Sequence, residues 1–154
     1  MTKSIIITLT LFSFISCKQP ATSKNDSGNI SNPSDSMVTQ WNKVWNSQDS
    51  AGIADMLTSD AQFVSEGTLR LSKDSICNTF IRKHYKLIRN LETKTINTDA
   101  SENLAYYYGS YSHDVQLPDT LIKGVNGTFS FIIKKSEIGW KLKVIGIEEN
   151  AAEN

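Results

Sequence analysis

The stretch "NLAYYYGSYSHDVQ", residues 103–116, contains four of the chain's five tyrosines and one of its two histidines. Successive side chains of a β-strand point to opposite faces of the sheet. One face therefore carries Ala105, Tyr107, Gly109, Tyr111 and His113. We predict that this odd-numbered set faces the core, because its alanine and glycine are small enough to let a sheet bend or a helix approach. The even-numbered set, with Tyr106 and Tyr108, is predicted to face outward.

Three further segments also have the features of strands: residues 92–99, 123–135 and 139–149. Short turns join consecutive segments along the chain. In the second of them the odd positions from Val125 to Ile133 are apolar or glycine, so they should face the core. In the last one the same alternation assigns the core positions to Trp140, Leu142 and Val144. Short connections between consecutive strands predict an antiparallel sheet.

The residues before these strands have helical periodicity. Apolar side chains recur at helical spacing from Val38 to Gln48, which predicts an amphipathic helix with Trp41 and Trp45 on its buried face. A short helix is expected over about 50–57, a strand over 61–67, a short strand near 67–72, and a longer helix, capped by Ser72 or Asp74, that runs to about Ile88. The order predicts an α+β domain: a cone-shaped, curved antiparallel sheet whose concave face is covered by about three N-terminal helices.

The first sixteen residues have the features of a secretory signal peptide. An apolar run from Ile5 to Ile15 follows a lysine, and it is shorter than the about 20 residues that a membrane-spanning helix needs. Residues 14–17, Phe-Ile-Ser-Cys, resemble a bacterial lipobox, in which the cysteine is lipidated. We therefore expect a lipoprotein anchored through Cys17. An ordinary secretory signal followed by a chance cysteine is the alternative.

Residues 17–36 are predicted to be a disordered tether between the lipid and the folded domain. The segment is rich in Ser, Asn, Asp and Pro and nearly free of large apolar side chains, so it cannot bury enough surface to fold. The expected location is the bacterial cell envelope, on the periplasmic or surface face of the outer membrane. The domain itself is expected to span residues 37–148, with a tail at 149–154.

Charge and composition exclude some functions. The 16 basic and 16 acidic residues balance, so a nucleic-acid partner is not expected. Two histidines without close ligand spacing do not predict a metal site, and no cofactor is expected. Cys77 lies on the apolar stripe of a predicted helix, which favours a buried structural thiol over a nucleophile.

Three stretches resemble the nuclear transport factor 2-like superfamily, specifically its SnoaL-like branch of small domains largely of unknown function. They are residues 41–67, with Trp41, residues 103–112, with Ala105 and Gly109, and residues 123–146, with Gly-Trp-Lys at 139–141. The resemblance covers about residues 37–148. It implies a cystatin-like conical roll with a pocket at its open end and frequent dimerisation through the outer face of the sheet. It also implies members that are isomerases, cyclases or dehydratases, or ligand binders without catalytic activity.

The predicted ligand-binding residues are those that alternation and helical spacing direct into the cone: Trp41, Trp45, Phe63, Tyr107, Tyr111, His113, Phe129 and Phe131. The even-numbered half of the tyrosine strand is not expected to line the pocket. An enzyme would need a general base, for which His113 and Glu66 are the candidates. Asp60 and Asp114 more simply cap or solvate turns, His84 edges a helix, and Glu66 starts a turn before Gly67.

Three functions remain open from the sequence. The first is a membrane-tethered module that binds a small, largely apolar ligand, and the second is an isomerase-, cyclase- or dehydratase-type enzyme. The third is a structural or interaction domain with a filled cone. A homodimer is expected through the outer sheet face, which alternation predicts to be apolar at Tyr106, Tyr108, Ile132, Ile145 and Ile147.

Overall fold

The computed structural model describes residues 34–150. The predicted signal peptide, Cys17, most of the tether and the last four residues of the predicted tail lie outside the described residues. The helical elements are α1 (Ser34–Asn46), α2 (Ser50–Asp55), α3 (Lys73–Ile76), a π-helical turn at Cys77–Ile81 and α4 (Arg82–His84). The strands are β1 (Leu57–Ser65), β2 (Thr68–Leu71), β3 (Ile88–Ala100), β4 (Leu104–Gln116), β5 (Leu121–Ser136) and β6 (Gly139–Glu149).

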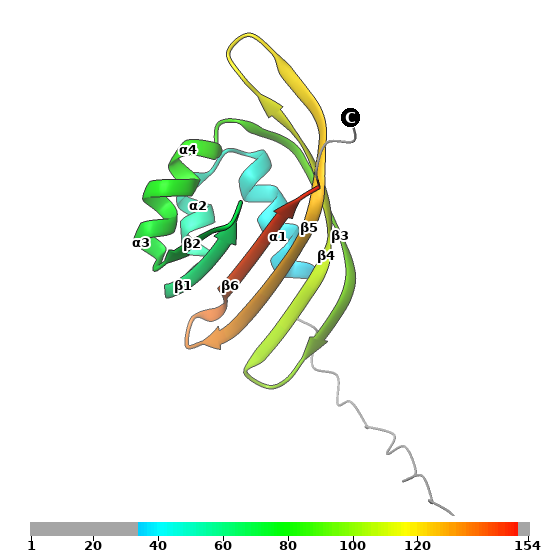
Figure 1. The fold of residues 1–154 in the computed structure, drawn as a ribbon. Coiled ribbons are helices and arrows are strands. Elements are labelled where there is room, and N and C mark those ends of the chain that lie inside the picture. The colour runs from blue at the N-terminus through cyan, green and yellow to red at the C-terminus, as the bar shows by residue number, and fades with distance from the viewer. Residues whose placement is uncertain (1–33, 151–154) are drawn as a thin grey trace, which may run out of the picture. The chain divides into compact units, whose positions relative to one another are not determined.

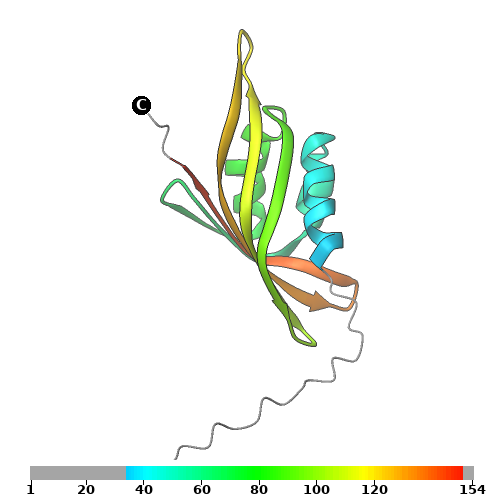
Figure 2. The same ribbon diagram turned by 90° about the vertical axis from the view of Figure 1, so that its right-hand side faces the viewer.

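The strands form one six-stranded sheet in the order β2-β1-β6-β5-β4-β3. The sheet curves strongly, the helices lie on its concave side, and the β4–β5 hairpin extends beyond the other strands (Figures 1 and 2). The predicted α+β class and helix-covered curved sheet are confirmed. One pair of strands departs from the expected antiparallel arrangement, because β1 pairs with β6 in parallel. The last strand inserts between β1 and β5, and this makes the sheet mixed.

The β4 and β5 strands have the predicted facing. Tyr107 is 1% exposed, whereas Tyr106 and Tyr108 are 41% and 43% exposed. On β5, Phe129, Phe131 and Ile133 are buried. The inward-facing residues of the two strands meet in the pairs Tyr107–Phe131 and Gly109–Phe129.

A β-bulge in β6 reverses the facing of the residues that follow it. Ile133 pairs with Leu142 and Ile132 pairs with Val144, so Lys143 is an extra residue. Leu142 and Ile145 are therefore both fully buried. The prediction that Val144 faces the core is wrong, and so is the assignment of Ile145 and Ile147 to the outer face, because a one-residue insertion reverses alternation.

The third predicted helix ends earlier than expected, at His84 instead of Ile88. Ser72 caps its start, because the Ser72 hydroxyl accepts a hydrogen bond from the Ser75 backbone N–H at 3.3 Å. At its far end the chain turns, and Ile88 pairs with Val115 as the first residue of β3. Pairing with β4 thus overrides the helical pattern of this segment.

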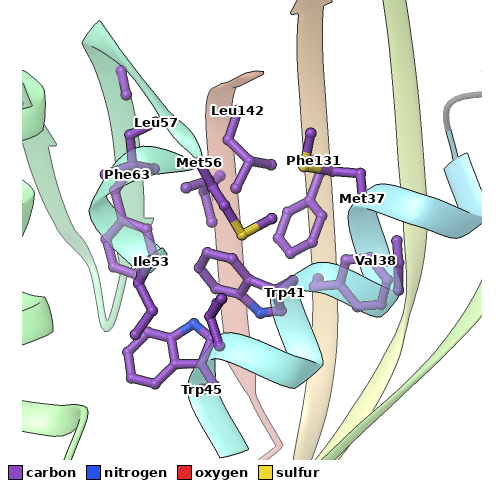
Figure 3. Packing of buried hydrophobic residues seen from close by; sticks show 14 of the residues in the cluster. Met37, Val38, Trp41, Trp45, Ile53, Met56, Leu57, Phe63, Phe131 and Leu142 are labelled. Atoms are coloured by element: carbon purple, nitrogen blue, oxygen red, sulfur yellow. The ribbon is translucent and has the colours of Figure 1, made fainter. Parts of the chain in front are cut away.

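Helix α1 closes the concave side of the sheet. Trp41 packs edge-on against Phe131 with ring centroids 5.2 Å apart, and Figure 3 shows the two side chains pointing toward one another from α1 and β5. Trp45 is 1% exposed. The Asn46 amide binds the Leu91 backbone at both ends: its nitrogen donates to the carbonyl at 2.9 Å and its oxygen accepts from the N–H at 2.7 Å. These contacts fix the helix against β3.

Candidate functional site

A cavity of about 740 Å³ opens between the helices and one end of the sheet. Its helical side comes from α1 and from the segment that contains the π-helical turn and α4. Its sheet side comes from the end of β1, the start of β3, the second half of β4, the middle of β5 and the end of β6. Apolar side chains from both the helical side and the sheet side dominate the lining of the chamber: Trp41, Trp45, Phe80, Leu87, Leu91, Phe129, Phe131 and Ile147.

Six of the eight predicted ligand-binding residues line this cavity: Trp41, Trp45, Tyr111, His113, Phe129 and Phe131. The other two do not. Tyr107 and Phe63 are each 1% exposed and belong to the packed core. Both were correctly predicted to face inward, but the core is filled at their level of the cone.

Residues of both faces of the sheet contribute to the cavity. Val64, Gly146, Ser130 and Tyr108 form a cross-strand row on the outer face, and all four line the space. The cavity volume therefore includes an inner chamber and space on the outer face of the sheet. The prediction that no even-numbered residue of the tyrosine strand lines the pocket is wrong for Tyr108.

Tyr111 and His113 form one polar part of the chamber. Their rings are stacked with centroids 5.6 Å apart and planes 6° apart, as expected for residues two apart on one strand face. Burial, followed by the negative charges of Glu149 and Glu66, raises the pKa of Tyr111 from 10.0 to about 12. Tyr111 is therefore a neutral phenol over the physiological pH range, and it can donate a hydrogen bond.

Gly127 makes room for the Tyr111 side chain. It is the cross-strand partner of Tyr111, and a Cβ atom added to it would lie 2.8 Å from the Tyr111 hydroxyl oxygen. The same Cβ would collide with the backbone carbonyl oxygen of Glu148. The sequence predicts that Gly127, as an odd-numbered residue of β5, faces inward. It does not predict the contact with Tyr111, because that contact depends on the register between β4 and β5.

His84 is a cavity residue that the sequence argument had assigned to a helix edge. Its ring stacks on the Phe80 ring with centroids 4.4 Å apart and planes 28° apart. Its Nδ1 atom lies 2.8 Å from the Phe80 carbonyl oxygen. The spacing of Phe80 and His84, four residues apart on a helix, is the signal that could have indicated this pair.

Arg70 is a second residue that the sequence argument missed. Its guanidinium carbon lies 5.3 Å from the centroid of the Phe80 ring and 5.5 Å from that of Phe63. Its Nη1 donates to the hydroxyl of the buried Ser65 at 3.1 Å. Within residues 34–150 no carboxylate forms an ion pair with it. Arg70 thus places a positive charge behind the Phe80 wall.

The acidic candidates have separate surroundings. Glu66 and Gly67 form the tight β1–β2 turn with φ angles of 50° and 67°, and Glu66 also lies on the cavity rim. The Asp60 carboxylate is exposed and pairs with Lys143, which lowers the pKa of Asp60. The Asp114 carboxylate accepts hydrogen bonds from the Asn90 amide at 2.8 Å and from the Gly124 N–H at 3.1 Å, which lower its pKa. Both aspartates lie within strands, β1 and β4, and their partners lie on neighbouring strands, so the assignment of these two residues to turns is wrong.

Other kinds of site are not evident in the described part of the chain. Residues 34–150 contain no cluster of three or more metal-ligating side chains. No helix among them is long and apolar enough to cross a bilayer. Cys77 is half-buried against the core, and burial raises the pKa of its thiol, which disfavours the reactive thiolate.

Comparison with known proteins identifies the fold. No family model and no curated protein matches the chain. Among solved structures, a ketosteroid isomerase-like protein from Erwinia carotovora atroseptica is similar, with a TM-score of 0.69 and 11% identity over 81% of this chain and 98% of that one.

Two further structures agree with this match. A nuclear transport factor 2-like protein of unknown function from Shewanella oneidensis has a TM-score of 0.61 and 13% identity over 74% of this chain and 94% of that one. An uncharacterized protein with a cystatin-like fold from Caulobacter vibrioides has a TM-score of 0.63 and 14% identity over 77% and 87% of the two chains. The chain therefore has the nuclear transport factor 2-like fold, which is also described as cystatin-like.

Proposed function

We propose that the domain binds a small, largely apolar ligand in the chamber between α1, the α4 region and the sheet. The observation that carries the proposal is the cavity beside an otherwise packed aromatic core. Its volume of about 740 Å³ comprises this chamber and the adjoining space on the outer face. Ligand sites are typically concave, have volumes of about 300–1,000 Å³, and combine apolar walls with a few polar groups. This cavity has that size and that composition.

An enzymatic function is the second candidate, and the stacked pair of Tyr111 and His113 favours it. A neutral phenol beside an imidazole combines a hydrogen-bond donor with a potential general base. Glu66, the other candidate base, lies at the rim in an exposed turn. Turnover of a bound compound that stops in His113→Phe while the compound still binds would favour the enzyme.

We also propose the lipoprotein assignment, the cell-envelope location and the SnoaL-like branch, which rest on the sequence. Cys17 would carry the lipid, and the segment to residue 36 would hold the domain away from the membrane. Two or more acyl chains give stable anchoring. Fatty-acid labelling and detergent partitioning of the full chain should both be lost in Cys17→Ala, and equal behaviour of the two proteins would refute the anchor.

Assembly into a homodimer through the outer sheet face is a further proposal, with a corrected residue set. The apolar residues that point outward there are Val64, Leu69, Leu71, Tyr106, Tyr108, Ile132 and Val144. They replace the predicted set that included Ile145 and Ile147. Cross-strand pairing joins Tyr106, Ile132 and Val144 in one row, and Val64 pairs with Leu69.

Blocking the chamber tests the ligand proposal. Leu87 lines the cavity and is half-buried, whereas its neighbour Lys86 is exposed and does not line it. Leu87→Trp should reduce the affinity for the neutral fluorescent probe N-phenyl-1-naphthylamine by about tenfold or more, which corresponds to about 1.4 kcal/mol. Lys86→Trp is the matched control and should bind like the parent. Absence of probe binding to the parent, or equal binding by all three proteins, would refute the chamber as the site.

A further inference from the structure

We propose that His84 is the polar anchor of the chamber and that its Nε2 atom accepts a hydrogen bond from a neutral hydroxyl group of the ligand. The inference rests on the proposed function and specifies the ligand class: an apolar molecule that carries an alcohol or phenol. Both histidines of the chain line the same cavity, and they are the two imidazoles available for such a contact.

The backbone fixes which ring nitrogen of His84 carries the proton. Nδ1 lies 2.8 Å from the Phe80 carbonyl oxygen, and a carbonyl oxygen can only accept a hydrogen bond. In the neutral ring Nδ1 must therefore carry the hydrogen, which leaves Nε2 with a free lone pair. Within residues 34–150 no hydrogen bond to Nε2 is found, while His84 itself lines the cavity.

The ring is also held in place, so that the acceptor has a defined position. His84 stacks on Phe80, and its Nδ1 contact is to the carbonyl of that same residue. Phe80 lies in the π-helical turn Cys77–Ile81, immediately before the short α4 segment that carries His84. Single π-helical turns inside α-helices occur frequently at functional sites.

The charges around the chamber favour a neutral donor. Arg70, which is always charged, lies 5.3 Å from the Phe80 ring on which His84 stacks, so an ammonium group near His84 would be repelled. The carboxylates of Glu66 and Glu149 lie near the Tyr111 part of the same cavity, where they oppose an anionic ligand. A hydroxyl group donates a hydrogen bond without carrying charge, and so it meets both constraints.

The test compares 2-naphthol with 2-methoxynaphthalene, which has the same ring system but no donor. Both compounds are measured at about pH 8, where 2-naphthol is an uncharged phenol. Calorimetry on the full chain at that pH should give about fivefold tighter binding of 2-naphthol, as one net hydrogen bond would produce. His84→Phe keeps a ring that can stack on Phe80 and should abolish the preference. Lys83→Ala, an exposed neighbour, should retain it.

Each outcome decides a different point. Equal affinities of the two compounds for the parent, or a preference that persists in His84→Phe, would overturn the role of His84 and leave the chamber intact as a binding site. Failure of the parent to bind either compound or the fluorescent probe would overturn the proposed function and this inference together. Long-range proton–nitrogen NMR of the free parent should show the proton on Nδ1, and a proton on Nε2 would overturn the inference regardless of binding.

Discussion

Tyr111 connects the packing of the domain to its electrostatics. Its ring is 8% exposed, its hydroxyl lies over Gly127, and its neighbours at the chamber mouth include two carboxylates. Burial and these negative charges both oppose the phenolate, so they shift the pKa in the same direction. The residue therefore has a measurable signature that does not depend on knowing the ligand.

Tyr111→Phe should change how stability depends on pH in the alkaline range. The folded-state pKa is about 12 and the ordinary value is 10.0, so between these values the unfolded chain loses this proton first. The free energy of unfolding of the parent should therefore fall as pH rises from about 10 toward 12, and this component should be absent from the variant. Urea unfolding of both proteins at about pH 9 and pH 11 measures it, and parallel pH dependences would contradict it.

At the scale of the elements, the β-bulge in β6 has the largest effect on which side chains face the core. The bulge at Lys143 places Ile145 in the core and Val144 on the outer face, the reverse of simple alternation. It also determines which residues of this strand reach the chamber, because Ile147 lines the cavity on the inner side. A strand without the insertion would direct these isoleucines outward.

Two substitutions that shorten side chains of β6 test this assignment. Ile145→Ala should lower the free energy of unfolding by about 2–5 kcal/mol, because it leaves a cavity in a fully buried site. Val144→Ala should cost less than about 1 kcal/mol in dilute solution, because the side chain is half-buried on the outer face. Chemical denaturation of both variants gives the comparison, and a larger loss for Val144→Ala would mean that the bulge is misplaced.

The same strand shows what the sequence could and could not predict. Odd positions on β4 and β5 were correctly assigned to the core, because these strands alternate without interruption from Ala105 to His113 and from Val125 to Ile133. A bulge leaves no comparable signal in "WKLKVIGIE", where apolar residues occupy both parities after Lys143. The parallel β1–β6 pair was likewise missed, because alternation does not report which strands become neighbours.

The candidate site was predicted where it depends on strand facing and missed where it depends on tertiary contacts. Alternation placed Tyr111, His113 and Phe129 on the inner face, and these residues do line the cavity. It could not show that the core is filled around Tyr107, or that Arg70 reaches across to the Phe80 ring. His84 was assigned to a helix edge because the sequence does not reveal where the helix ends.

At the scale of the whole molecule, the outer sheet face should determine the oligomeric state. Ile132 is 36% exposed between Tyr106 and Val144 in one cross-strand row, near the centre of the apolar patch. Ile132→Lys should convert a dimer to a monomer, because it places a charge where two sheets would pack. Sedimentation equilibrium at micromolar concentrations measures the mass of each protein.

Lys134, two residues further along the same strand, provides the control, because its side chain is already charged and exposed. Lys134→Ala should leave the dimer intact. A parent domain that sediments as a monomer at high micromolar concentration would refute the proposed dimer, and an unchanged mass of Ile132→Lys would refute this patch as its interface.

The parallel pairing of β1 with β6 also affects how the chain matures during synthesis. The ribosome releases β1 early, but the neighbour of Phe63 in the finished sheet is Ile145, near the end of the described chain. Contacts between such distant segments slow folding, and until they form, the apolar strand stays accessible to chaperones and proteases. The nascent chain cannot complete this sheet until β6 has left the ribosome.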